Sequence, residues 1–159
     1  SEIGTSLGMS DKTVKHYLDI LVGTFMIRQL QPWHENIKKR QVKAPKIFFR
    51  DSGIFHWFLT VPSFHELMTH PKLGASWEGF ALEEVVRYHH VPENNVFFWG
   101  VHGQGELDLL LLHRGKRLGF EVKYIDAPKV TSSMVLARDT LNLDRLTVIY
   151  PGKEHYMLD

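Results

Sequence analysis

The sequence contains no cysteine, which excludes disulfides, thiolate zinc sites and cysteine nucleophiles together. It also has no apolar run approaching the roughly 20 residues that a membrane-spanning helix needs. Its first residues lack the charged head and apolar core of a signal peptide. We therefore expect a cytoplasmic protein that does not act in a membrane. A metal ion, if one is bound, would be held by oxygen or imidazole ligands.

The sequence also has no large excess of positive or negative charge. The formal net charge is only +1 over 159 residues, so nucleic acid could be bound only through a local basic patch. Hydrophobic residues make up 43% of the chain, which is enough for a folded core. The chain starts at Ser1, directly in a helical pattern, and we expect it to be a piece of a longer polypeptide.

Nucleotide-binding fingerprints are also absent from the sequence. The glycines of GVHGQG (100–105) lie between two expected strands and do not open a helix, and no GxxxxGK[ST] motif occurs. The ten histidines show no paired ligand spacing on a helix face, so scattered surface histidines are the better interpretation.

Residues 1–60 have the pattern of a winged helix-turn-helix. Apolar positions at helical spacing in 1–21 are interrupted at Gly8, and Ser10 or Asp11 suits the N-cap of a second helix. Strands are expected at 25–33 and 46–50, with the polar, basic loop between them as the wing. In this unit the second helix would enter a major groove and the wing would touch phosphates. The expected DNA contacts are Thr13, Lys15, His16, Lys38, Lys39, Arg40 and Lys43. The alternative is that the unit only packs against other protein and that its lysines are solvated.

A helical linker is expected at 61–72, followed by an α/β domain at 73–159. The hydrophobic pattern predicts the order α-β-β-β-α-β, with a serine pair capping the second helix. The expected ranges are a helix at 76–89, strands at 96–99, 106–112 and 118–123, a turn at 114–116, a helix at 132–141 and a strand at 146–150.

Charged residues of this second domain fall where they could converge. Glu78 opens the long helix, Asp108 begins an apolar strand, and alternation puts Glu121 and Lys123 on one face of the next strand. Carboxylates suit Mg²⁺, a hard cation that takes oxygen ligands, so Asp108, Glu121 and Glu78 are the candidate metal ligands. With Lys123 near the reacting phosphate, the set fits phosphodiester hydrolysis. The plainer alternative is a salt bridge between Lys123 and a neighbouring carboxylate.

These segments together resemble a known family. The motifs NIKKR, K-x-P-K, D-x-G, GELDLLL and FEVKY are similar to the C-terminal region of prokaryotic AAA-type ATP-binding proteins. The resemblance implies a winged helix followed by a PD-(D/E)XK nuclease-like domain, similar to archaeal Holliday-junction resolvases. It places the nuclease motif on Glu78, Asp108, Glu121 and Lys123. The family's ATPase domain is not in this chain, so ATP hydrolysis is not expected of these residues.

Two functions follow from this reading. The first is DNA binding with Mg²⁺-dependent endonuclease activity, in the C-terminal part of a larger ATPase. The second is a catalytically silent module that regulates that ATPase or binds a protein partner, and self-association stays open in both. A plain transcription regulator would leave the three carboxylates unexplained.

Overall fold

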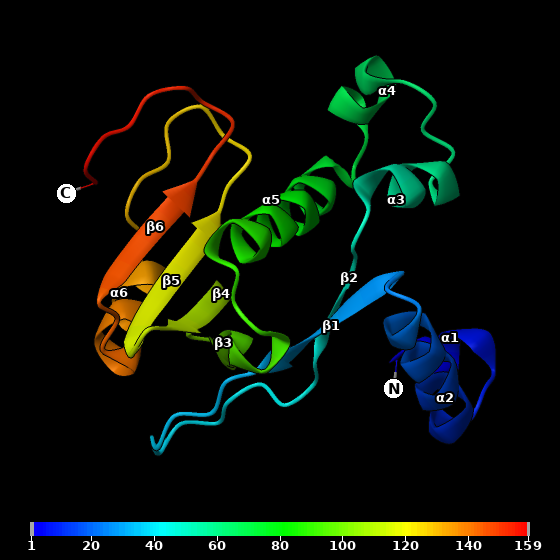
Figure 1. The fold of residues 1–159 in the computed structure, drawn as a ribbon, viewed down its shortest axis with the longest axis horizontal. Helices are drawn as coiled ribbons and strands as arrows, with labels where there is room; N and C mark the ends of the chain where they lie inside the picture. Colours follow the sequence, from blue (N-terminus) through cyan, green and yellow to red (C-terminus); the bar gives the residue numbers. More distant parts are fainter. Residues whose placement is uncertain (1, 159) are drawn as a thin grey trace.

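The computed structural model describes residues 2–158, which form a mixed α/β fold around one sheet (Figure 1). Within this range the helices are α1 (Glu2–Leu7), α2 (Asp11–Gly23), α3 (Ser52–Phe58), α4 (Phe64–Thr69), α5 (Leu73–His89) and α6 (Ser132–Leu141), with a 3₁₀ turn η1 (Glu93–Asn95). The strands of the same range are β1 (Ile27–Pro32), β2 (Lys46–Phe49), β3 (Val96–Val101), β4 (Gly105–His113), β5 (Lys116–Val122) and β6 (Arg145–Ile149).

The strands of the described range pair in the order β2-β1-β3-β4-β5-β6. Neighbours β2–β1, β3–β4 and β4–β5 are antiparallel, whereas β1–β3 and β5–β6 are parallel. The β1–β3 pairing is short, with Gln31 opposite Phe97 and Pro32 opposite Phe98. Through it the ribbon of β1 and β2 joins the sheet of the C-terminal half. The division into 1–60, 61–72 and 73–159 stays a prediction.

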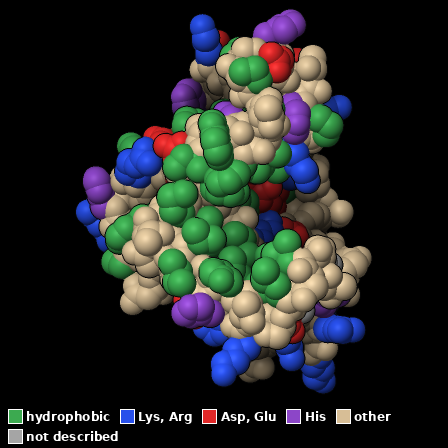
Figure 2. Space-filling model, turned by 90° about the vertical axis from the view of Figure 1, so that its right-hand side faces the viewer, with side chains coloured by type: hydrophobic (Ala, Val, Ile, Leu, Met, Phe, Trp, Pro, Cys, Tyr) green, Lys and Arg blue, Asp and Glu red, His purple; other side chains and the backbone are tan. Residues whose placement is uncertain are grey.

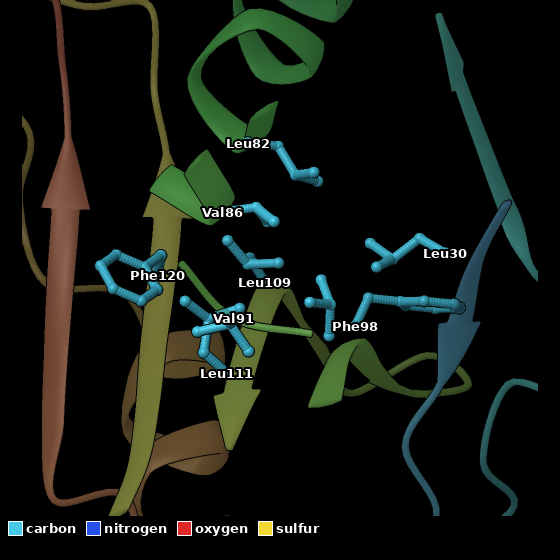
Figure 3. Close-up of a cluster of buried hydrophobic side chains, with 9 residues drawn as sticks. Leu30, Leu82, Val86, Val91, Phe98, Leu109, Leu111 and Phe120 are labelled. Carbon is cyan, nitrogen blue, oxygen red and sulfur yellow. The ribbon is translucent and has the colours of Figure 1, made fainter. Parts of the chain in front are cut away.

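Helix α5 covers one face of this sheet. Its apolar side chains Leu82 and Val86 pack onto residues of β1, β3, β4 and β5, so one core spans four strands (Figure 3). Removing this much apolar surface from water is the main favourable term in folding. The buried members are Leu30, Leu82, Val86, Val91, Val96, Phe98, Leu109, Leu111 and Phe120.

Helix α6 packs on the sheet as well, over a second core. Ala137 and Leu141 from α6 meet Trp99 of β3 with Leu107 and Leu110 of β4, and all five side chains are fully buried. The Trp99 ring nitrogen donates a hydrogen bond to a side chain of the loop that joins β1 to β2. Helices on the sheet thus bury the apolar residues of its central strands.

The predicted order of elements in the C-terminal half is the observed one, and helix α6 has the predicted limits. The expected helix cap is wrong. Thr131, one residue before the serine pair, accepts the hydrogen bond from the Met134 amide. Ser133 instead exchanges hydrogen bonds of 2.8 Å with the backbone N–H and carbonyl of Glu106, which fastens α6 to the start of β4.

Near the N-terminus, Ser10 caps α2 by accepting from the Thr13 amide, as the pattern predicts. The loop between β1 and β2 is fastened to the end of β3. The Val42 amide donates to the Gly100 carbonyl at 2.9 Å, and Gln41 bridges to Val101. Within the expected wing, the backbone of Gln41 and Val42 therefore pairs with the end of β3.

The face that carries the N-terminal helices has many hydrophobic side chains at its surface (Figure 2). The exposed ones include Tyr17 and Ile20 of α2, Phe25 after it, and Trp57 and Phe58 of α3. None of the helices within residues 2–158 combines the length and apolar character needed to cross a bilayer.

Candidate functional site

Asp108 and Glu121 lie beside each other on β4 and β5. The two strands pair antiparallel with Leu109 opposite Phe120, so the next positions bring the two carboxylates together. The pairing of β4 with β3 shifts by one residue just there, between Phe97 and Trp99. Such a β-bulge re-aims side chains and is frequent next to active sites.

Backbone and lysine contacts fix this pair of carboxylates. The Val122 amide donates a 2.9 Å hydrogen bond to Asp108 Oδ2. Lys123 Nζ lies 3.0 Å from Glu121 Oε2, as their shared strand face predicts. The Glu121 side chain is only 4% exposed, whereas that of Lys123 is 37% exposed and can reach a ligand.

Glu78 approaches the same spot from the first turns of α5. A lysine that sequence reasoning missed, Lys46 of β2, links it to the strands. Its Nζ lies 3.3 Å from Glu78 Oε1 and 3.8 Å from Asp108 Oδ1, and it also contacts Glu106. The carboxylate cluster therefore consists of Glu78, Glu106, Asp108 and Glu121, with Lys46 and Lys123 as its cations.

Aromatic side chains form one wall of the site. Trp77 precedes Glu78 on α5, and its ring meets the edge of Tyr124 at 5.9 Å between centroids. Since Tyr124 follows Lys123, this contact holds the start of α5 against the end of β5. Among the described side chains, the buried Trp77 Nε1 has no hydrogen-bond partner.

The carboxylate cluster contains four carboxylates and only two lysines, and the pKa values of its members are shifted accordingly. Burial and the negative charge of Asp108 raise the pKa of Glu121 to about 7, although Lys123 acts in the opposite direction. Burial also raises the pKa of Glu78 against the effect of Lys46. For both lysines, burial would lower the pKa, but the surrounding carboxylates raise it overall, so the ammonium forms are favoured.

The donor chemistry fits a divalent cation in part. In residues 2–158, no group of three or more His, Asp or Glu side chains is arranged to hold a metal ion as it stands. Magnesium, however, is commonly bound by one or two carboxylates together with water and substrate phosphate. Asp108 and Glu121, which are adjacent and repel each other, are a pair of that kind.

The residues expected to contact DNA lie on two separate elements. On α2, Thr13 is exposed and hydrogen-bonds Ser10, while Lys15 forms an exposed ion pair with Asp19 at 2.7 Å. His16 is exposed beside Tyr17. The remaining four follow in the β1–β2 loop, where all are exposed: Lys38, Lys39, Arg40 and Lys43.

Comparison with known protein families places both halves of the chain. The family described as Domain of unknown function (DUF4143) matches residues 73–159, which is more than half of the chain and includes Lys123 and all four carboxylates of the cluster. The chain belongs to the DUF4143 family. This domain is typically the C-terminal region of AAA-ATPase-associated proteins. A second family, Domain of unknown function (DUF8612), matches residues 1–65, the part that carries Lys46.

Two mycobacterial proteins are similar to this DUF4143 protein over almost the whole length of the chain. They are the Uncharacterized protein Rv2008c of Mycobacterium tuberculosis and the Uncharacterized protein Mb2031c of Mycobacterium bovis. Each is 39% identical over 158 residues, which is 99% of the chain but 35% of the relative. The chain thus spans about a third of the length of these relatives. No solved structure matches it.

Proposed function

We propose that the chain binds DNA and hydrolyses its phosphodiester bonds in a Mg²⁺-dependent reaction at the carboxylate cluster. The observation that carries this proposal is the meeting of Glu78, Asp108 and Glu121 from three different elements. Burying like charges side by side costs free energy, and such costly clusters of carboxylates are concentrated at functional sites. A phosphoryl-transfer site supplies one.

Each residue has a role in this proposal. Asp108 and Glu121 would hold Mg²⁺, with Glu78 completing the set directly or through water. The bound ion would supply positive charge at the scissile phosphate and make water a better nucleophile at neutral pH. Lys123, which reaches solvent, would donate hydrogen bonds to the phosphate and favour the added negative charge of the transition state.

The fold type is part of the proposal. The α5-β3-β4-β5-α6-β6 order, with carboxylates at the first helix and on two adjacent strands, supports a PD-(D/E)XK nuclease-like domain. Helices α1 and α2 followed by the β1–β2 ribbon support a winged helix. Its exposed basic loop would provide phosphate contacts. Because DUF4143 domains typically end AAA-ATPase-associated proteins, we propose that an ATPase of the same polypeptide controls this activity.

A cleavage assay tests the proposal. Supercoiled plasmid and branched DNA are incubated with the protein in Mg²⁺, in Mn²⁺ and in EDTA. The matched variants are Lys123→Met, which removes a cluster lysine, and Lys129→Met, which makes the same change at an exposed position. We expect metal-dependent cleavage that Lys123→Met reduces by about 100-fold and Lys129→Met leaves unchanged. Equal cleavage by the two variants would show that the activity does not come from this site.

One observation favours the second function, a catalytically silent regulatory or protein-interaction module. Lys46 contacts Glu78, Asp108 and Glu106, so the cluster holds a protein cation where a metal would approach. If the chain binds DNA without metal and does not cleave it in either Mg²⁺ or Mn²⁺, this second function is favoured.

A further inference from the structure

Lys46 reaches the carboxylate cluster from the N-terminal part of the chain. It is the first residue of β2, held in register by its pairing with Leu30 of β1. Two residues further along, the Phe48 ring lies against Gly79 of α5, 3.5 Å from where a Cβ would stand. This close approach of β2 to α5 brings Lys46 to Glu78, one residue before Gly79.

The Lys46 ammonium is well suited to stay there. Only 24% of its side chain is exposed, and its Nζ lies 5.3 Å from the centre of the Phe98 ring, a favourable cation–π position. It contacts carboxylates of Glu78, Glu106 and Asp108, two of which are ligands of the proposed metal site. A half-buried lysine with three anionic contacts neutralises charge that would otherwise be costly.

Two cations cannot share these oxygens at short range without strong repulsion. We propose that Lys46 is a built-in counter-cation of the cluster, which a divalent metal ion must displace from Glu78 and Asp108 in order to bind. This inference rests on the proposed function. It makes metal affinity depend on the position of β2, and hence on the basic loop that leads into β2.

Metal titration tests this competition. Mn²⁺ binding is measured by the electron paramagnetic resonance of free Mn²⁺ for the wild-type protein, Lys46→Met and Lys129→Met. Lys129 is exposed, so its variant carries the same loss of charge outside the cluster. We expect Lys46→Met to bind Mn²⁺ at least about tenfold more tightly than the wild type, and Lys129→Met to bind as the wild type does.

A second variant guards against failure of Lys46→Met to fold. Lys46→Met combined with Glu106→Gln removes the lysine together with one anionic partner, so the net charge of the cluster is preserved. Glu106 is 46% exposed and is not among the proposed metal ligands. Tighter Mn²⁺ binding by either variant supports the competition.

Mn²⁺ affinity that is no higher in the two Lys46 variants than in the wild-type protein, or no Mn²⁺ binding by any of these proteins, overturns the inference. The proposed function can fail separately. If the Lys46 variants bind Mn²⁺ more tightly but no protein cleaves DNA, Lys46 remains the competing cation and the nuclease proposal is contradicted.

Discussion

The buried carboxyl of Glu121 gives a stability prediction that can be worked out from the structure. Its pKa rises from an ordinary value near 4.5 to about 7, chiefly through burial and the charge of Asp108. Below pH 4.5 the carboxyl is neutral in both the folded and the unfolded chain. As the pH rises toward 7 the unfolded chain loses this proton first, so the free energy of unfolding falls. Above pH 7 the full penalty is present.

The perturbation is Glu121→Gln, which keeps the size of the side chain and an oxygen that can accept from Lys123 but carries no charge. At 1.36 kcal/mol per pKa unit, ionising Glu121 costs on the order of 3 kcal/mol more in the folded protein than in the unfolded chain. The variant should therefore be more stable than the wild type by about 3 kcal/mol at pH 8 and by less than about 1 kcal/mol at pH 5.

The assay is urea unfolding followed by tryptophan fluorescence at both pH values, with EDTA present so that bound metal does not contribute. Glu154→Gln is the matched control, because Glu154 is exposed. It should change stability by less than about 0.5 kcal/mol at either pH. A Glu121→Gln protein that is no more stable than the wild type at pH 8, or equally stabilised at both pH values, would refute the reasoning.

Two further changes test how the sheet is held together. Arg28 of β1 and Glu83 of α5 form a buried bidentate ion pair, so Glu83→Gln should destabilise the protein by about 3–5 kcal/mol in urea unfolding. Lys15→Met removes an exposed ion pair and should lower the free energy of unfolding by less than about 1 kcal/mol. Similar losses of stability in Glu83→Gln and Lys15→Met would contradict this account. A Cβ at Gly119 would lie 2.5 Å from a leucine methyl group, whereas Gly23 has nothing within 4 Å. Gly119→Ala should therefore lower stability by about 1–3 kcal/mol and Gly23→Ala should not, with thermal unfolding as the check; a tolerant Gly119 would show that the neighbouring side chains move aside.

Local patterns in the sequence were sufficient for most helices and strands. Apolar periodicity located α6, and the turn before β5 is where Arg114 and Gly115 take positive φ, as a tight hairpin requires. The cap of α6 is not decided by local sequence, because Thr131, Ser132 and Ser133 are all residue types that cap helices. What separates them is a tertiary contact, the hydrogen bonds of Ser133 to Glu106 of β4.

The carboxylate cluster could be predicted only in part, for the same reason. Glu121 and Lys123 share a strand face, so their proximity follows from the period of a β-strand. The position of Lys46 depends on the pairing of β1 with β3 and on the packing of β2 against α5, both between segments far apart in sequence. One local signal was present, since Lys46 is a charged residue opening an otherwise apolar strand.

The most direct test of the account is cleavage of end-labelled branched DNA with the protein in excess, comparing the wild type with Asp108→Asn and with Asp126→Asn, an exposed matched control. Asparagine keeps an oxygen for the Val122 amide but lacks the charge that would bind metal. The account predicts Mg²⁺-dependent cleavage by the wild type and Asp126→Asn and none by Asp108→Asn. Absence of cleavage by all three proteins, or equal cleavage by all three, would contradict it.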